Sequence, residues 1–405
     1  MKNKIFALCA LSAFALTLFF AACSDKTETN DYYFAEPQSY SEYKLFGSTQ
    51  FEGRGKIMGA DALLRISDEN NFSSQEEYDR AIALWQDIKR VLIDTNASIS
   101  ATVKNSCISR FNAAEAGAKV EIDKTAYDVF TLAKSVYIQT EGYYNPAVYD
   151  SLRLFGFTLD GREPYVSKLP DGQDINAFRE LSSHFDKVEL SQESGKYYAR
   201  KPAETVTVGG VEYSLKVDLG GIGKGWCADI IDEMTSEAGF EYGFFSFSSS
   251  SMAVKKYTDA SKNNEYTLRI RDPRDVDGAY FEVKCKDRRL STSGDYEKYY
   301  LFDGERYCHI IDPTTGAPIK TGVASVTVIG GDAAEDDAYT TALSAMGKER
   351  AVNFINENLS NRKVVALIFE DGAGKIITNC PQDIKITNEN YTLANTVADG
   401  KIVLN

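Results

Sequence analysis

The chain has 405 residues, 43% of them hydrophobic and 12% aromatic, which is enough to bury a substantial core in one large domain or two closely joined lobes. Its formal net charge is −14 and no basic stripe is visible, which argues against a nucleic-acid partner. Beyond residue 23 the cysteines show no CxxC spacing, which disfavours a disulfide scaffold or a zinc site. We interpret them as small core residues, and a single disulfide is the alternative.

The first 22 residues have the pattern of a lipoprotein signal peptide. Lys2 and Lys4 are followed by an almost wholly apolar run over 5–20, and small residues then lead into Cys23. The run is shorter than the roughly 20 residues of a membrane-spanning helix, so a signal peptide is favoured over a transmembrane anchor. We expect Cys23 to carry a lipid and residues 23–45 to form a flexible tether. The protein would then be a membrane-anchored lipoprotein on the periplasmic or extracytoplasmic side.

Helix-like and strand-like patterns alternate over residues 46–405, which predicts an α+β domain of two closely joined lobes with no linker between them. Ser73 and Glu76 have the spacing of a capping box ahead of a helix. Asp123 is placed to cap a second helix. The remaining patterns predict a hairpin over 187–200, strands over 266–270, 324–329 and 364–369, and helices over 226–238 and 336–346.

The strongest local signal is the glycine-rich segment VDLGGIGKGW at 217–226. Glycines in a loop ahead of a helix let backbone N–H groups approach an anion, and the helix N-terminus adds a positive dipole. Lys224 supplies a full charge, so the segment suits a pyrophosphate. It is neither a Walker A loop nor a dinucleotide fingerprint, because Asp218, Gly225 and Trp226 stand where those motifs need other residues. A plain strand-to-helix turn is the alternative.

Asp337 and Thr341 are spaced i, i+4 and therefore share one face of a predicted helical turn. A carboxylate and a hydroxyl are hard oxygen ligands, and Mg²⁺ commonly takes few protein ligands beside phosphate and water. The alternative for Asp337 is helix capping.

His309 ends a strand-like run just before a Pro/Gly turn, where an exposed general base could lie. A hydrogen-bonded structural histidine is the alternative. The chain has only two histidines, which excludes a multi-histidine metal centre, and we interpret His184 as a surface residue. The polar segment 291–294 is expected to form a turn that either donates to phosphate or closes a hairpin. A serine hydrolase is disfavoured because the chain lacks a GxSxG elbow.

Together these segments resemble the ApbE-type family of FAD:protein FMN transferases, also known as thiamin-biosynthesis lipoproteins. The resemblance extends from about residue 56 to about residue 370. It covers, in the family's order, the segments 57–59, 106–112, 142–146, 218–224, 271–273, 291–294, 309–316 and 337–341.

The resemblance implies a T-fold-like architecture and a single catalytic unit that binds FAD. Residues of four of these segments would contact FAD: Met58, Tyr143, Tyr144, Asn145, Asp218, Lys224 and Ile311. Of these, Met58 and the segment Tyr143-Tyr144-Asn145 would line the isoalloxazine and adenine regions. The backbone carbonyl of Gly221, with Asp337 and Thr341, would hold Mg²⁺. His309 matches the histidine proposed as the base in the family.

The implied reaction is Mg²⁺-dependent transfer of FMN from FAD to a Thr or Ser hydroxyl, with release of AMP. The implied acceptor lies in an extracytoplasmic domain of a membrane electron-transfer protein. Two alternatives remain open from sequence: an FAD pyrophosphatase that uses water as the nucleophile, and a flavin-binding lipoprotein without turnover.

The chain departs from the family pattern at three places. Asn145 stands where Asp is usual, Ser100 takes the place of a tyrosine, and Ser246-Phe247-Ser248-Ser249 replaces an Asn-x-Gly-Gly segment. These changes leave Lys224, His309 and the predicted metal ligands intact. We therefore expect catalysis to persist with an altered acceptor preference.

Overall fold

A computed structural model describes residues 32–69, 71–157, 163–248 and 250–405 of the chain. The predicted signal peptide and the lipidation residue Cys23 lie outside the described residues. Within the described ranges, no helix combines the length and apolar composition needed to cross a membrane.

The structure differs from the predicted tether between residues 33 and 45, because this segment holds two ordered elements. β1 (Tyr33–Phe34) pairs antiparallel with β2 (Phe51–Ile57), and the Phe34 ring packs edge-on against Trp85 at 5.8 Å. α1 (Tyr40–Leu45) begins with a capping box at Ser39. Aromatic packing therefore anchors a stretch whose polar composition alone indicated a tether.

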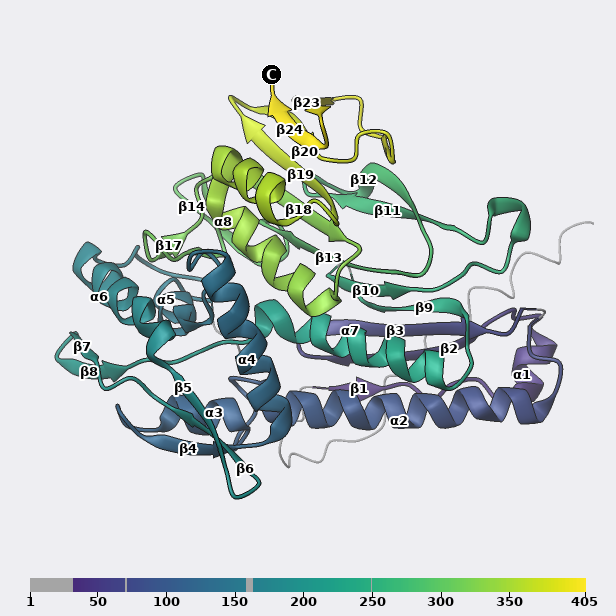
Figure 1. Cartoon of the computed structure of the whole chain (residues 1–405), viewed down its shortest axis with the longest axis horizontal. Helices are drawn as coiled ribbons and strands as arrows, with labels where there is room; N and C mark the ends of the chain where they lie inside the picture. Colours follow the sequence, from purple (N-terminus) through teal and green to yellow (C-terminus); the bar gives the residue numbers. More distant parts are fainter. Residues whose placement is uncertain (1–31, 70, 158–162, 249) are drawn as a thin grey trace, which may run out of the picture. The chain divides into compact units, whose positions relative to one another are not determined.

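One ten-stranded sheet runs through the structure, in the order β1-β2-β3-β9-β10-β13-β18-β19-β20-β22 (Figure 1). Neighbouring strands are antiparallel except β20 and β22, which are parallel. The other strands of this sheet are β3 (Ala60–Ser67), β9 (Tyr242–Phe247), β10 (Ser251–Val254), β13 (Arg288–Gly294), β18 (Val323–Ile329), β19 (Lys363–Glu370), β20 (Ala373–Thr378) and β22 (Tyr391–Leu393).

Three long helices line one face of this sheet: α2 (Gln75–Ile99), α7 (Gly220–Glu237) and α8 (Ala333–Asn358). α2 contacts β2, α7 contacts β9 and β10, and α8 contacts β13 and β18. A small sheet of β11 (Tyr266–Asp272), β12 (Asp275–Cys285) and β21 (Ile384–Ile386) packs with the other face. Successive side chains of β19 point to opposite faces of the sheet. Val364 and Ala366 pack into the core on the helix side, and Val365 and Leu367 pack into the core under the small sheet.

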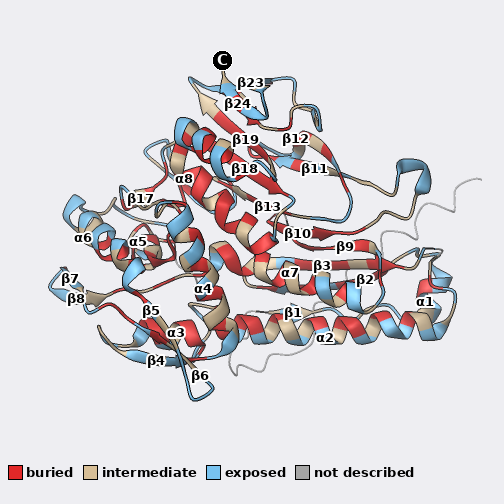
Figure 2. Ribbon diagram, viewed as in Figure 1, coloured by how far each residue is buried: buried red, intermediate tan, exposed pale blue. Residues whose placement is uncertain are grey.

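A second lobe holds the elements between α2 and α7 and is joined to the first by a continuous core. Val129 and Val136 of α4 lie in the same hydrophobic cluster as Ala338 and Ala342 of α8, and Figure 2 shows buried stretches on both helices. The lobe comprises α3 (Cys107–Ala113), β4 (Lys119–Ile122), α4 (Lys124–Gln139), η1 (Pro146–Val148), α5 (Tyr149–Leu154), α6 (Gly172–Ser182), η2 (Ser183–Lys187), β5 (Glu189–Glu193), β6 (Lys196–Arg200), β7 (Thr205–Val208) and β8 (Val211–Ser214). This is the α+β arrangement of two closely joined lobes that the sequence predicts.

The remaining elements are short hairpins and one turn of 3-10 helix. They are η3 (Ala260–Lys262), β14 (Tyr299–Phe302), β15 (Glu305–Cys308), β16 (Ile311–Asp312), β17 (Ala317–Pro318), β23 (Asn395–Ala398) and β24 (Lys401–Leu404). The five cysteines of the described ranges are buried free thiols, as expected for core residues.

Several predicted boundaries are confirmed and others are wrong. Asp123 caps α4 as predicted, through the Ala126 N–H at 2.8 Å, and β5 and β6 form the predicted hairpin. The capping box of α2 is one residue later than predicted, at Ser74 and Glu77. The polar segment 291–294 is not a turn, because it pairs along its length with β18 as the end of β13.

Candidate active site

The glycine-rich segment begins a helix instead of forming a loop ahead of one, so the predicted helix start at Trp226 is wrong. α7 begins at Gly220, with Leu219 as N-cap residue. Close packing overrides the low helix propensity of glycine. A Cβ at Gly223 would lie 2.7 Å from Ile99 Cδ1, and a Cβ at Gly225 would overlap the backbone carbonyl of Ala333 in α8. The glycines therefore allow α7 to approach both neighbouring helices.

The start of α7 keeps the features that suit an anion. Gly220 is exposed, and its N–H donates to Asp218 Oδ1 at 2.6 Å. Lys224 Nζ folds back on the Gly220 carbonyl at 3.0 Å. Asp218 is half-buried, and burial raises its pKa, although the Gly220 N–H and the charges of Lys298 and Lys224 oppose this rise. A helix N-terminus and a lysine thus lie on the same turn.

The three predicted Mg²⁺ ligands lie together where α7 meets α8. Asp337 is 2% exposed, and its carboxylate accepts one hydrogen bond from a described residue, the Gly225 N–H at 3.2 Å. A Cβ built on Gly221 would lie 3.4 Å from Thr341 Oγ1. Thr341 Oγ1 also lies 3.5 Å from the Ser293 hydroxyl. The structure brings these groups together, and their role as ligands remains a prediction.

The chemistry of this junction fits a hard cation with oxygen ligands. Burial raises the pKa of Asp337, against the charge of Lys224 and the Gly225 N–H. A buried carboxylate with a single donor is costly unless a further charge partner binds it. The described residues hold no cluster of three or more His, Cys, Asp or Glu side chains suited to a metal. An ion here would take oxygen from Asp337, Thr341 and Gly221 and from the substrate, which suits Mg²⁺ better than zinc.

Tyr144 also faces this junction. Its ring lies 3.5 Å from the Cβ position of Gly221. The side chain is 3% exposed, and its hydroxyl is buried without a hydrogen-bond partner among the described residues. Burial, with the charges of Asp337 and Asp218, raises its pKa well above the usual value. A buried hydroxyl of this kind is a free donor for a ligand. Tyr143 is half-buried, and the Arg350 guanidinium lies over its ring at 5.1 Å.

Two predicted FAD contacts use their side chains within the protein. Asn145 caps η1 by accepting from the Ala147 N–H at 2.9 Å, and its amide donates to the Ser182 carbonyl at 3.1 Å. An aspartate could make the first bond but not the second, which gives the departure from the family pattern a structural reason. The Ile311 side chain is 5% exposed within an aromatic cluster. Contact between these residues and FAD would therefore come mainly from backbone atoms.

Met58 lies at the tip of the β2–β3 hairpin, and Ser248 contacts the same hairpin. Met58 and Gly59 have φ of 55° and 73°, as in a type I′ turn. Ser248, in the β9–β10 turn, holds a positive φ of 45° that the family's glycine would adopt freely. Its hydroxyl accepts from the Asp61 N–H at 3.1 Å. Ser100 caps the end of α2, and residue 249 lies outside the described residues.

His309 is half-buried, not exposed as predicted. Its Nδ1 is buried and has no hydrogen-bond partner among the described residues. Burial lowers the pKa of its imidazole to about 4, and the charges of Lys298 and Lys224 add to this effect. The imidazole is therefore neutral at neutral pH and can accept a proton. His184 lies elsewhere, half-buried in η2 of the second lobe.

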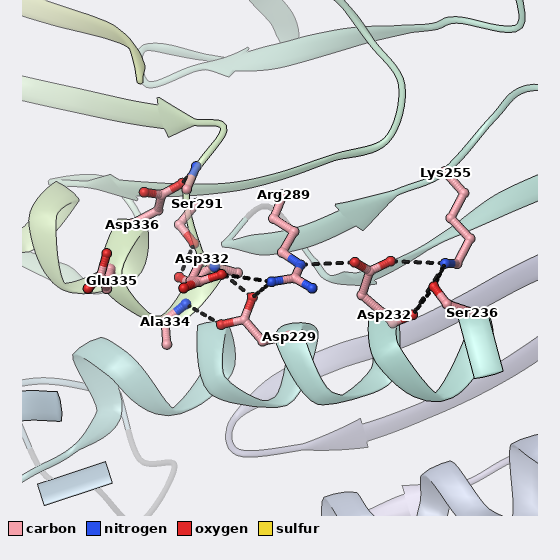
Figure 3. Close-up of polar contacts among 12 residues, drawn as sticks. Asp229, Asp232, Ser236, Lys255, Arg289, Ser291, Asp332, Ala334, Glu335 and Asp336 are labelled. Atoms are coloured by element: carbon pink, nitrogen blue, oxygen red, sulfur yellow. Dashed lines mark hydrogen bonds and ion pairs between the residues drawn. The ribbon is translucent and has the colours of Figure 1, made fainter. Parts of the chain in front are cut away.

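Sequence reasoning missed the residues that hold α7 against α8. Asp229 accepts hydrogen bonds from the backbone N–H groups of Ala333 at 2.7 Å and Ala334 at 2.9 Å, so it caps α8 from the neighbouring helix (Figure 3). Arg289 of β13 bridges Asp229 at 3.2 Å and Asp232 at 2.9 Å. The signal in the sequence was the i, i+4 spacing of Gly225 and Asp229, which places both on the face of α7 toward α8.

Comparison with known proteins identifies one family over most of the chain. The model of the ApbE family matches residues 58–367. An FAD:protein FMN transferase of Escherichia coli K12 is 26% identical over 338 residues, which cover 83% of this chain and 86% of that protein. One of Vibrio cholerae is 29% identical over 277 residues, covering 68% and 77%.

Solved structures show the same fold. The flavin transferase ApbE from Vibrio cholerae superposes with a TM-score of 0.64 at 26% identity, covering 81% of this chain and 96% of that one. The ApbE protein from Thermotoga maritima gives a TM-score of 0.64 at 25% identity, with 81% and 96% covered. The match of the family model over most of its length shows that the chain belongs to the ApbE family.

Proposed function

We propose that this protein is an FAD:protein FMN transferase that moves FMN from FAD to a hydroxyl of an acceptor protein and releases AMP. The observation that carries the proposal is the meeting of Asp337, Thr341, Gly221 and Lys224 where α7 joins α8. The flavin part of the proposal is supported by similarity to relatives that are FAD:protein FMN transferases.

The start of α7 would bind the pyrophosphate of FAD. Its helix dipole and the Lys224 ammonium favour an anion at this point. Asp337, Thr341 and the Gly221 carbonyl would hold Mg²⁺, which, when bound, neutralises phosphate charge. The unpartnered Tyr144 hydroxyl lies beside them and is free to donate to the same ligand.

His309 would take the proton of the acceptor hydroxyl, because its imidazole is neutral and unprotonated at neutral pH. The hydroxyl oxygen forms a bond to the phosphorus on the FMN side. The bond from that phosphorus to the bridging oxygen breaks, and AMP leaves with the electron pair. Positioning and charge neutralisation carry most of such phosphoryl transfer.

The proposal extends to the acceptor and the location. The acceptor hydroxyl would be that of a Thr or Ser in an extracytoplasmic domain of a membrane electron-transfer protein. A lipid on Cys23 would tether the enzyme to the same membrane. The signal-like pattern of the first 22 residues and the polar stretch after Cys23 support this location.

The test is flavinylation of a defined acceptor. The full chain is mixed with FAD, Mg²⁺ and a soluble acceptor domain that bears one candidate Thr, and the acceptor mass is read intact. The acceptor domain with its Thr and a Thr→Ser acceptor should each gain the mass of one FMN, and a Thr→Val acceptor should gain none. An unmodified wild-type acceptor beside free FMN would show hydrolysis instead, and FAD retained unchanged would show a flavin-binding protein.

A further inference from the structure

Lys298 stands directly opposite His309. The β14–β15 hairpin pairs Tyr299 with Cys308, and the His309 N–H donates to the Lys298 carbonyl at 3.0 Å, which extends the ladder by one pair. Residues opposite each other on antiparallel strands send their side chains to the same face, with Cβ atoms about 5 Å apart. The Lys298 side chain therefore leaves the hairpin on the face that carries the His309 imidazole.

The Lys298 ammonium extends to the β2–β3 turn. Its Nζ lies 3.9 Å from the Cβ position of Gly59, in the turn that also holds Met58. Its charge lowers the pKa of both Asp218 and His309. The distance to Gly59 and the two pKa shifts together place the ammonium between the β2–β3 turn, the segment before α7 and the His309 imidazole.

The charge of Lys298 is uncompensated by the part of the chain that the structure describes. No hydrogen bond or ion pair of its Nζ is found there, and Asp218, the nearby carboxylate, lies beyond ion-pair distance. Lys224 contributes a second ammonium that acts on the same two groups. Both cations act on the half-buried Asp218 carboxylate, and Lys224 also acts on the buried Asp337 carboxylate, which leaves the Lys298 ammonium without a paired carboxylate of its own among the described residues. An ammonium in this position favours a bound anion.

We propose that Lys298 is a second substrate-binding cation, which contacts the FAD phosphate that the acceptor attacks. This inference rests on the proposed function. The attacked phosphorus must lie close to the acceptor hydroxyl, and that hydroxyl must lie within reach of its base, His309. A cation opposite His309 is therefore placed on the FMN-side phosphate, while Lys224 is placed on the pyrophosphate at the start of α7.

The placement of Lys298 also couples substrate binding to the basicity of His309. The charged groups that act on the imidazole are Lys298 from the hairpin and Lys224 from α7, and both disfavour protonation. A phosphate bound between them offsets their charge. His309 then becomes a better proton acceptor only when FAD is in place, and proton uptake is favoured at the moment of transfer.

Two measurements test the role of Lys298 in the full-length chain. The first is NMR titration of the imidazole signals without ligand. The chain has only two histidines, so His184→Gln assigns the signal of His309. Lys298→Gln should raise the pKa of His309, Lys298→Arg should leave it low, and the remote control Lys385→Gln should not move it. An unchanged pKa of His309 in Lys298→Gln would show that the Lys298 charge does not lie near the imidazole.

The second measurement is FAD affinity and transfer. Lys298→Gln should raise the KM for FAD, or the Kd if turnover is absent, on the order of tenfold, because one charge-assisted hydrogen bond is lost. Lys298→Arg should restore most of the affinity, and Lys385→Gln should match wild type. Equal FAD affinity in Lys298→Gln and wild type would overturn the inference. Absence of transfer in wild type would instead overturn the proposed function and leave the comparison of FAD affinities valid.

Discussion

The backbone N–H of Gly225 donates a hydrogen bond of 3.2 Å to the carboxylate of Asp337. This bond joins the second turn of α7 to the second turn of α8. The start of α7 at Gly221 lies beside Thr341, and the start of α8 at Ala333 lies against Gly225. The predicted metal ligands and the predicted pyrophosphate-binding lysine are neighbours because these two helices touch there. The predictions about Mg²⁺ and Lys224 depend on this junction.

Gly225→Ala should destabilise the protein by about 2 kcal/mol or more, because the added Cβ would overlap the Ala333 carbonyl and push α8 away. FAD turnover should fall with it. Gly172→Ala is the control, since Gly172 is also a helical glycine but its Cβ would meet nothing within 4 Å. Urea denaturation of both variants checks the prediction. Equal stability of Gly225→Ala and Gly172→Ala would show that α7 and α8 tolerate a wider spacing.

Asp337→Asn should lower Mg²⁺-dependent FAD turnover by about 100-fold or more, because an amide is a weak ligand for a hard cation. Its thermal stability should be equal to or higher than that of wild type without Mg²⁺, since a buried carboxylate with one donor is replaced by a neutral group. Release of AMP across a Mg²⁺ titration measures the first effect. Turnover equal to wild type at every Mg²⁺ concentration would contradict the metal assignment.

Thr341 offers a paired test of the hydroxyl ligand. Thr341→Ser keeps an oxygen beside Gly221 and Ser293 and should retain most of the Mg²⁺ affinity. Thr341→Val has the same shape without the hydroxyl and should require at least about tenfold more Mg²⁺. The measurement is the Mg²⁺ concentration at half-maximal turnover. The assignment fails if both variants need the same concentration as wild type.

His309→Gln should reduce transfer by about 100-fold to 10,000-fold, the range expected for loss of a general base. The imidazole also affects stability. Between pH about 4 and 6.5 the unfolded chain binds a proton at His309 that the folded protein does not, so the stability of wild type relative to His309→Gln should rise with pH over this window. Denaturation at several pH values measures the difference. A difference that falls with pH would mean that folding raises the pKa.

Asp229→Ala should cost about 1–2 kcal/mol of stability, because two backbone N–H groups at the start of α8 lose their acceptor. It should also raise the Mg²⁺ concentration needed for half-maximal turnover, since Asp337 lies one turn further along the same helix. Asp232→Ala is the control, because Asp232 also binds Arg289 but does not cap α8. If both variants lose turnover equally, the cap has no special role at the site.

Lys201 should make stability depend on pH in alkaline solution. It is 1% exposed, and burial lowers its pKa to about 8, with the charge of Lys216 adding to this effect. Between pH about 8 and 10.5 the unfolded chain keeps the proton that the folded protein has lost, so stability should rise with pH relative to Lys201→Met. The rise should total ~3 kcal/mol. A flat difference across this range would show that Lys201 stays charged in the folded protein.

Much of the fold and the predicted site follows from local patterns. Asp123 signals its helix because a cap needs only the residues beside it. The buried strands β18 and β19 are signalled by their runs of β-branched and apolar residues. The ordered resemblance brought Gly221, Asp337 and Thr341 to one site, and they do lie together.

The features that sequence reasoning missed depend on contacts between distant residues. The start of α7 at Gly220 depends on packing against Ile99 and α8, which overrides glycine's preference for loops. The position of Lys298 depends on the pairing of β14 with β15 and on the approach of the β2–β3 turn. The cap by Asp229 joins residues 104 positions apart. Periodicity cannot reveal such contacts because they depend on how the helices and lobes pack.

The most direct test of the central claim counts both products of one reaction. The wild-type full-length chain is incubated with FAD, Mg²⁺ and the Thr-bearing acceptor domain, and AMP, free FMN and flavinylated acceptor are quantified together. We predict one AMP for each acceptor that gains FMN, with little free FMN and no products when Mg²⁺ is chelated. AMP and free FMN in equal amounts beside an unmodified acceptor would contradict a transferase and indicate FAD hydrolysis.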